Sequence, residues 1–229
     1  MSRTALVAGA SGLVGGHLLH LLLADAAYGR VITLARRQLD VRHAKLDQRV
    51  VDLGALDDLS DLPHVDDAFC CLGTTIKKAG SQEAFRRVDY DYVLGLARTA
   101  QRAGARQFLL VTALGADASS RIFYSRVKGE VEQAVRQLPF QGIQIFRPSS
   151  LMGDRAEVRL AERVGVPVAR ALAPLLVGPL RRYRPIDAAD VARAMVQIAE
   201  EAPRGPNVFE YDGIVAATGA APSSAHSSS

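Results

Sequence analysis

The sequence predicts an α/β fold: a Rossmann-type doubly wound parallel sheet with a small C-terminal region that covers the substrate. Three observations lead to this fold class. Short apolar runs alternate with longer helical patterns, a glycine-rich turn follows the first run, and the pattern becomes irregular after Arg147. Alternating strands and helices favour a parallel sheet with both faces covered, and right-handed crossovers make it doubly wound.

The expected elements follow one another along the chain in a regular order. Six strands are expected, at Thr4–Ala8, Val31–Leu34, Arg49–Val51, Ala68–Leu72, Gln107–Thr112 and Ile143–Phe146. Helices are expected between them at Val14–Leu23, Ser81–Ala103 and Ile122–Leu138. The last third should hold helices at Arg155–Ala173 and Ala188–Ala199 and a short strand at Asn207–Glu210.

We expect residues 1–218 to form a single NAD(P)-binding Rossmann domain and residues 219–229, which are small and polar, to be a disordered tail. About residues 150–210 should cover the substrate pocket. Within them, Pro167–Leu180 is apolar and contains Pro174 and Pro179, which kink or end a helix. This segment is expected to be a bent, mobile lid, and a fixed core segment is the alternative.

The composition is typical of a soluble globular protein. Of 229 residues, 48% are hydrophobic and 23% are charged, and the net charge of +4 is spread along the chain. Nucleic acid is therefore not an expected partner. No secretory signal is visible, and the longest apolar stretch is too short and too interrupted to span a membrane, so the expected location is cytoplasmic. No metal site is expected.

The first strand runs into a G-x-x-G-x-x-G motif, Gly9-Ala10-Ser11-Gly12-Leu13-Val14-Gly15. Gly9 permits a tight exit turn, Gly12 lets a pyrophosphate approach the backbone, and Gly15 lets the helix pack close to the strand. The N–H groups of the helix N-terminus and the Ser11 hydroxyl can then bind phosphate. This context favours a dinucleotide cofactor, and a glycine-rich turn without a ligand is the alternative.

The residues after the second and third strands bear on which cofactor binds. The second strand ends at Arg36 and Arg37, where a site specific for NAD usually has an acidic residue for the ribose 2′-hydroxyl. Two guanidinium groups instead suit a 2′-phosphate, which favours NADPH (NADP+) over NADH. A solvated basic turn is the alternative. Asp52 follows the third strand and either lies near the adenine or caps the next helix.

The fourth strand ends in Cys70-Cys71-Leu72-Gly73-Thr74-Thr75. Gly73 permits close approach of the cofactor, and Leu72 and Thr74 flank it. Adjacent cysteines do not form an ordinary disulfide, and no neighbouring His or Asp supports a thiolate nucleophile. We therefore expect the two cysteines to pack and not to react.

Candidate catalytic residues lie on the helix expected at Ile122–Leu138. Tyr124 and Lys128 are spaced i and i+4 and so share one face. A neighbouring ammonium lowers the pKa of a phenol and helps it to exchange a proton with a carbonyl or alcohol oxygen. The same Lys can reach the nicotinamide ribose. Thr112, at the end of the fifth strand, could bond the substrate oxygen, although β-branched Thr also simply suits strands.

Other candidates lie after the sixth strand and on the long helix. The backbone at Pro148 should meet the nicotinamide carboxamide, while Arg155 and Arg159 could reach the pyrophosphate or be solvated. Asp89 could orient the Lys128 ammonium through a water molecule, and surface solvation is the alternative that we favour.

Taken together, these residues resemble the extended and atypical branch of the short-chain dehydrogenase/reductase superfamily. More closely, they resemble the Tat-interactive protein oxidoreductase family and its bacterial relatives. The fragments that carry the resemblance are Gly9-Ala10-Ser11-Gly12, Arg36-Arg37, Cys70-Cys71-Leu72-Gly73-Thr74-Thr75, Val88-Asp89-x-Asp91-Tyr92-Val93-Leu94, Gly115-Ala116-Asp117 and Tyr124-x-x-Val127-Lys128-Gly129-Glu130-Val131-Glu132.

The resemblance implies bound NADPH and a Tyr-Lys active site. The cofactor contacts that it implies are near Ser11, Gly12, Leu13, Val14, Arg36, Arg37, Leu72, Gly73, Tyr124, Lys128, Leu151 and Arg159. The chain departs from the superfamily at three positions. Thr112 stands where Ser is usual, Ser149 stands where many members have Gly, and Asp89 stands where many have Asn.

The function expected from the sequence is that of an NADPH-binding oxidoreductase, with hydride transfer between nicotinamide and a small carbonyl or alcohol substrate. One alternative is an NADPH-sensing binding protein with little or no turnover. A second is a nucleotide-sugar epimerase or dehydratase, for which the chain is short. A protein partner or a homodimer is possible, and the sequence names neither the substrate nor the oligomeric state.

Overall fold

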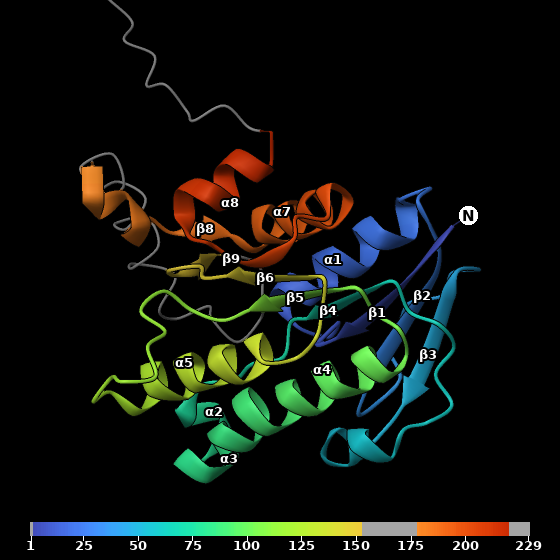
Figure 1. Ribbon diagram of the computed structural model, residues 1–229, viewed down its shortest axis with the longest axis horizontal. Helices are drawn as coiled ribbons and strands as arrows, with labels where there is room; N and C mark the ends of the chain where they lie inside the picture. The colour runs from blue at the N-terminus through green and yellow to red at the C-terminus, as the bar shows by residue number, and fades with distance from the viewer. Residues whose placement is uncertain (1, 153–177, 220–229) are drawn as a thin grey trace, which may run out of the picture.

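The computed structural model describes residues 2–152 and 178–219. Its central feature is a seven-stranded parallel sheet with the strand order β3-β2-β1-β4-β5-β6-β9 (Figure 1). The strands are β1 (Arg3–Ala8), β2 (Tyr28–Ala35), β3 (Leu46–Val50), β4 (Asp67–Cys70), β5 (Gln107–Val111), β6 (Gly142–Phe146) and β9 (Gly205–Phe209). The chain crosses from β3 back to β4 beside β1, so the sheet has its topological switch point between β1 and β4.

Helices cover both faces of the sheet, as Figure 1 shows. The helices on one face are α1 (Leu13–Ala24), α7 (Ala188–Glu201) and α8 (Tyr211–Ala217). The helices on the other face are α2 (Ile76–Ala79), α3 (Gln82–Arg86), α4 (Tyr92–Arg102) and α5 (Phe123–Arg136). The predicted fold class, a Rossmann-type α/β sheet, is therefore confirmed.

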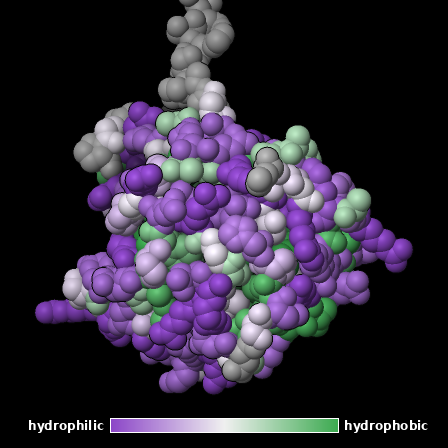
Figure 2. Space-filling model, turned by 45° about the vertical axis from the view of Figure 1, so that its right-hand side comes forward, coloured by the Kyte–Doolittle hydropathy of each residue, from purple (hydrophilic) through white to green (hydrophobic). Residues whose placement is uncertain are grey.

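Each face of the sheet carries its own apolar core. Every residue of β4, β5 and β6 is buried, as expected for strands that are covered on both sides. One core packs α1 and α7 on the sheet, and the other packs α4 and α5 on the opposite face. The face seen in Figure 2 is largely hydrophilic, with a few apolar patches. Within residues 2–152 and 178–219, no helix is long and apolar enough to cross a membrane.

The helix expected at Ser81–Ala103 is interrupted. α3 ends at Arg86, a π-turn occupies Arg87–Asp91, and α4 begins at Tyr92. A π-turn widens the helical ring to i→i+5 and changes which side chains face inward after it. The expectation of one continuous helix is therefore wrong at its middle, and the interruption places Asp89 in a buried position.

The C-terminal part contains elements both expected and unexpected. The short strand expected at Asn207–Glu210 is confirmed as β9, which pairs with β6. A two-stranded sheet joins β7 (Leu151–Met152) to β8 (Ile186–Asp187), and a 3-10 helix occupies Gly178–Tyr183. Several expectations fall outside the described residues. These concern the helix expected at Arg155–Ala173, the candidate Arg159, most of Pro167–Leu180 and residues 220–229 of the expected tail.

Candidate active site

The predicted site residues gather at one edge of the sheet. Gly9–Gly15 follow β1, Arg36 and Arg37 follow β2, and Asp52 follows β3. Leu72–Thr74 follow β4, Thr112 follows β5, and Pro148 and Leu151 follow β6. Because all seven strands are parallel, these segments all leave from the same edge. In open α/β sheets, ligands bind outside the carboxyl ends of the strands.

The glycine-rich turn is built by close backbone contacts. Gly9 has a φ of +85°, and its Cβ, if it had one, would lie 2.4 Å from the Cys71 carbonyl. A Cβ on Gly15 would lie 2.1 Å from the Gly9 oxygen. The N–H of Gly12 donates to the Gly9 carbonyl at 2.8 Å. Gly9 and Gly15 therefore admit only glycine, and the packing of the turn itself requires these two residues of the motif.

The first turn of α1 has the character of an anion site. Its N-cap is Gly12, which supplies no side-chain hydrogen bond, and the first turn has no acidic residue. The N-cap residue therefore has no side chain that competes with a ligand for the N–H groups of this turn. Ser11 is exposed beside them. A pyrophosphate fits the chemistry of this turn.

Two arginines follow β2. Arg36 and Arg37 are both exposed, and neither guanidinium forms an ion pair with a residue of the described part of the chain.

After β3, Asp52 Oδ1 accepts a hydrogen bond from the Gly54 N–H at 2.9 Å. Asp52 thus caps the 3-10 helix at Leu53–Asp58. The sequence left two alternatives for Asp52, a helix cap and an adenine contact. The cap is confirmed, and the adenine contact stays a prediction.

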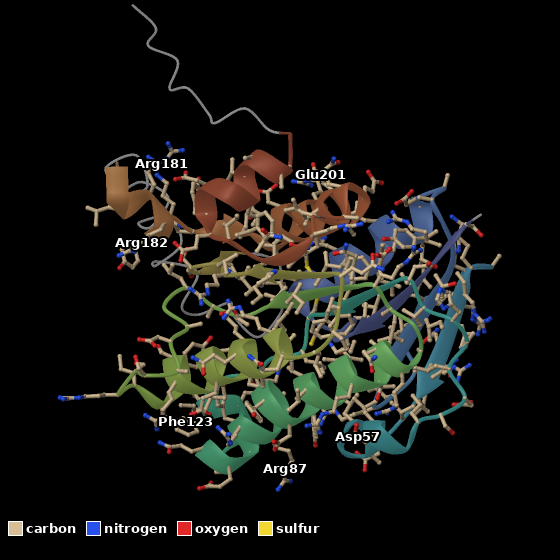
Figure 3. All side chains as sticks on the ribbon, viewed as in Figure 1. Asp57, Arg87, Phe123, Arg181, Arg182 and Glu201 are labelled. Atoms are coloured by element: carbon tan, nitrogen blue, oxygen red, sulfur yellow. The ribbon has the colours of Figure 1, made fainter. Side chains whose placement is uncertain are left out.

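α5 positions Tyr124 and Lys128 on its inward stripe. The ring of Tyr124 is half-buried and packs against Phe85 of α3, with 5.3 Å between ring centroids. Lys128 lies one turn further along and only 6% of its side chain is exposed. Phe123, labelled in Figure 3, marks the start of α5 at the carboxyl edge of the sheet. The phenol and the ammonium therefore lie on one helix face.

The Lys128 ammonium forms a direct ion pair with Asp89. Nζ lies 2.7 Å from Oδ1, and the Asp89 side chain is fully buried. Its other oxygen, Oδ2, accepts the Thr74 N–H at 3.0 Å. A Cβ on Gly73 would lie 3.5 Å from Asp89 Oδ1 and 3.6 Å from Lys128 Nζ. The pair thus lies against the segment that follows β4. The expectations of a bridging water or a solvated surface carboxylate are wrong.

The ion pair determines the charge of the ammonium. Burial acts to lower the pKa of Lys128, but Asp89, acting together with Tyr124 and Cys70, leaves the pKa of Lys128 raised. Burial also raises the pKa of the Cys70 thiol, to about 12. Cys70 is therefore a neutral neighbour, and both cysteines are unpaired, as expected from the sequence.

The loop after β5 is packed directly on α5. A Cβ on Gly129 would lie 2.1 Å from the Ala118 nitrogen and 2.2 Å from the Asp117 carbonyl carbon. The Asp117 N–H also donates to the Ser125 carbonyl at 3.0 Å. Gly129, directly after Lys128, therefore allows this loop to lie on the helix beside the Tyr-Lys pair.

Thr112 has a partner that the sequence analysis did not identify. Its hydroxyl donates to Glu132 Oε1 at 2.7 Å in a buried position. Glu132 also accepts hydrogen bonds from the guanidinium groups of Arg147 and Arg136. The structure therefore places the Thr112 hydroxyl in a buried network on α5, and its proposed bond to a substrate oxygen stays a prediction.

The segment after β6 runs beside the loop after β5. The Leu114 N–H donates to the Pro148 carbonyl at 2.9 Å, and the Ser149 hydroxyl donates to the Arg184 carbonyl. Leu151 begins β7 and is 38% exposed. Within residues 2–152 and 178–219, no group of three His, Cys, Asp or Glu side chains could hold a metal ion.

Comparisons with known proteins agree with this architecture. Residues 5–211 match the model of the NAD dependent epimerase/dehydratase family. Protein HTATIP2 of Rattus norvegicus is 40% identical over 165 residues, which are 70% of this chain and 68% of that protein. A protein of Emericella nidulans, "Protein fmp52, mitochondrial", is 35% identical over 179 residues, 75% of this chain and 76% of its own.

Two solved structures share the fold. The human epimerase family protein SDR39U1 with NADPH has a TM-score of 0.63 and 18% identity, and the match covers 91% of this chain and 74% of that one. MoeE5 in complex with UDP-glucose and NAD has a TM-score of 0.65 and 16% identity, covering 93% and 80%. One of these proteins was solved with NADPH and the other with NAD.

The comparisons correct the location expected from the sequence. Several fungal relatives, from Emericella nidulans, Candida albicans and Lodderomyces elongisporus, are named mitochondrial proteins. A plain cytoplasmic location is therefore contradicted.

The family match spans most of the chain, and the rat relative covers more than two thirds of it. The fold and the glycine-rich turn agree with both. The resemblance drawn from the motifs is confirmed. The chain belongs to the NAD dependent epimerase/dehydratase family, within the extended short-chain dehydrogenase/reductase superfamily.

Proposed function

We propose that this protein is an NADPH-dependent oxidoreductase that acts on a small carbonyl or alcohol substrate. The observation that carries the proposal is the buried ammonium of Lys128, held beside Gly73 and one helical turn from Tyr124. Burying an ammonium costs free energy, and the ion pair with Asp89 offsets that cost but does not by itself explain why the charge is there. The position of Lys128 at the carboxyl edge of the sheet, where ligands bind in such folds, supports a role in catalysis.

The chain's residues fit a dinucleotide. The uncapped first turn of α1 would hold the pyrophosphate, and Gly73 would let the cofactor approach the backbone. Arg36 and Arg37 support NADPH over NADH, because both are exposed and no carboxylate stands at the end of β2. When bound, the cofactor supplies or accepts a hydride.

Tyr124 would provide the proton. Tyr124 has a hydroxyl that can exchange a proton with a substrate oxygen, and the Lys128 ammonium lies one helical turn away on the same helix face. Tyr124 Oη would donate its proton to a carbonyl oxygen in reduction and accept one from an alcohol in oxidation. Lys128 would tune Tyr124 and contact the nicotinamide ribose. The half-buried position of Tyr124 against Phe85 fixes the direction of its ring.

The test uses purified full-length protein with a panel of aldehydes, ketones, secondary alcohols and nucleotide sugars. Turnover is followed by cofactor absorbance and by product analysis. We expect reduction of at least one carbonyl class, which Tyr124→Phe should slow by about 10²–10⁴-fold and which Tyr92→Phe, a matched change on α4, should retain. Equal rates in the native protein and Tyr124→Phe would overturn the proposal. Conversion of a nucleotide sugar without net change of cofactor would favour an epimerase instead.

A further inference from the structure

We propose that Asp89 is a positioning residue that keeps the Lys128 ammonium both charged and in place within the Tyr124–Lys128 site. The inference rests on the proposed function for its meaning, but its test needs neither cofactor nor substrate. It starts from the position of Asp89 at the centre of the π-turn at Arg87–Asp91. Interruptions of this kind are frequent at functional sites.

The contacts of Asp89 use both of its oxygens. Oδ1 lies 2.7 Å from Lys128 Nζ, and Oδ2 accepts the Thr74 N–H at 3.0 Å. One carboxylate therefore joins three elements: the π-turn, α5 and the segment after β4. Since an ammonium has three N–H donors, the ion pair leaves Lys128 donors for Tyr124 and for a ribose hydroxyl.

The surroundings make the charge of Lys128 depend on this one partner. Only 6% of the Lys128 side chain is exposed, so water does little to stabilise the ammonium. The groups of the described chain that act on it electrostatically are Asp89 from the π-turn, Tyr124 from its own helix and Cys70 from β4. Cys70 is neutral near physiological pH because burial raises the pKa of its thiol to about 12. Asp89 is thus the one carboxylate among these groups.

The consequence concerns the pH range in which the site works. A buried lysine without a counter-ion readily loses its proton near neutral pH. An uncharged Lys128 would carry no positive charge to place beside Tyr124 and would bind ribose hydroxyls more weakly. The Asp89 carboxylate prevents this loss, and the Thr74 N–H prevents the carboxylate from turning away.

The experiment is an NMR titration of isotope-labelled lysine side chains in the cofactor-free protein. The chain has only four lysines, Lys45, Lys77, Lys78 and Lys128, so the Lys128 signal can be assigned by its loss in Lys128→Met. In the native protein, Lys128 should titrate above the ordinary lysine pKa of about 10.4. In Asp89→Asn it should titrate lower than in the native protein by roughly 1–3 pH units, the effect of removing an adjacent opposite charge.

The Asn substitution is chosen because its amide oxygen still accepts the Thr74 N–H, so the charge is lost while the contact remains. Asp91→Asn, an exposed change in the same π-turn, is the matched control and should leave the Lys128 titration unchanged. An unshifted Lys128 in Asp89→Asn would overturn the proposal. If that variant does not fold, the native protein decides: titration of Lys128 below the ordinary lysine pKa of about 10.4 would overturn the proposal, and titration above it would support the proposal.

The readout separates this proposal from the proposed function. A native protein without turnover on any carbonyl could still show the Lys128 shift, which would leave the role of Asp89 intact. Conversely, turnover that depends on Tyr124 with no shift in Asp89→Asn would retain the oxidoreductase and reject Asp89 as the group that holds the charge.

Discussion

The hydroxyl of Thr112 donates to the carboxylate of Glu132 at 2.7 Å, across the gap between the end of β5 and α5. Glu132 is fully buried and also accepts from Arg147 Nε at 2.9 Å and from Arg136 at 3.2 Å. The carboxylate therefore joins the ends of β5 and β6 to the helix that carries Tyr124. This network holds α5, which carries Tyr124, against the sheet. The first prediction therefore concerns its contribution to the free energy of unfolding.

Glu132→Gln should destabilise the fold by about 3 kcal/mol, because it leaves the Arg147 guanidinium without its buried counter-charge. Glu130→Gln on the same helix is the control. Glu130 is partly exposed and pairs with Arg86 and Arg126, so its loss should cost no more than about 1 kcal/mol. Urea unfolding of the three proteins measures the difference. Equal destabilisation by the two changes would show that the buried network of Glu132 stabilises the fold no more than the partly exposed ion pairs of Glu130.

The native protein should bind NADPH more tightly than NADH. The combined change Arg36→Asp with Arg37→Ser should reverse the order, because the new carboxylate accepts the ribose 2′-hydroxyl and repels a 2′-phosphate. Each lost charged hydrogen bond should cost about 1.5–3 kcal/mol of NADPH binding. Titration calorimetry with both cofactors measures this, and Arg42→Ser is an exposed control. Equal native affinities for the two cofactors would contradict the prediction.

Tyr124→Phe should bind NADPH with nearly native affinity but lower turnover by about 10²–10⁴-fold, the usual contribution of a general acid or base. Only the transferable proton is removed, while the ring still packs on Phe85. Lys128→Ala should weaken both binding and turnover, since Lys128 is expected to contact the ribose. Calorimetry and single-turnover rates separate the two effects. A Tyr124→Phe protein that binds NADPH poorly would assign the phenol to binding.

Asp66 provides a pH-dependent contribution to stability. Burial acts to raise the pKa of Asp66, but the hydrogen bonds from the Thr4 N–H and Arg106 outweigh it and leave the pKa lowered. A carboxyl whose pKa is lower in the folded state stabilises the fold above its unfolded pKa, and this contribution is lost as the pH falls through the folded value.

The prediction for Asp66→Asn is therefore a loss of roughly 1 kcal/mol at neutral pH that disappears below the ordinary carboxyl range. Urea unfolding of the native protein and the variant at several pH values measures it. Asp61→Asn is the control, because Asp61 is largely exposed in its ion pair with Arg49. A difference between Asp66→Asn and the native protein that persists unchanged in acid would contradict the assigned cause.

Much of the fold follows from local sequence patterns. The glycine-rich turn could be predicted because two of its glycines, Gly9 and Gly15, stand where a Cβ would clash with the backbone. β9 could be predicted from the short stretch Asn207–Glu210, which follows a helix and contains Val208 and Phe209. The two-residue strands β7 and β8 could not, because periodicity needs more residues than they contain.

Part of the site could also be predicted from local sequence patterns. Tyr124 and Lys128 are four residues apart, and Glu132 is four residues further, so the spacing that paired the first two also signals an inward Glu132. Asp89 gave no such signal. It lies in the polar run Val88-Asp89-Tyr90-Asp91, and a π-turn there breaks the 3.6-residue period by which burial is inferred.

The contact of Gly9 with the Cys71 carbonyl has a thermodynamic consequence. Because the backbone of the turn after β1 touches the backbone at the end of β4, neither can move without the other. The ordering of this turn therefore comes with folding of the chain. A cofactor that bound there, as proposed, would not have to order the turn, so its affinity would be reduced less by the cost of ordering. A Gly9→Ala change would therefore weaken folding and ligand affinity together.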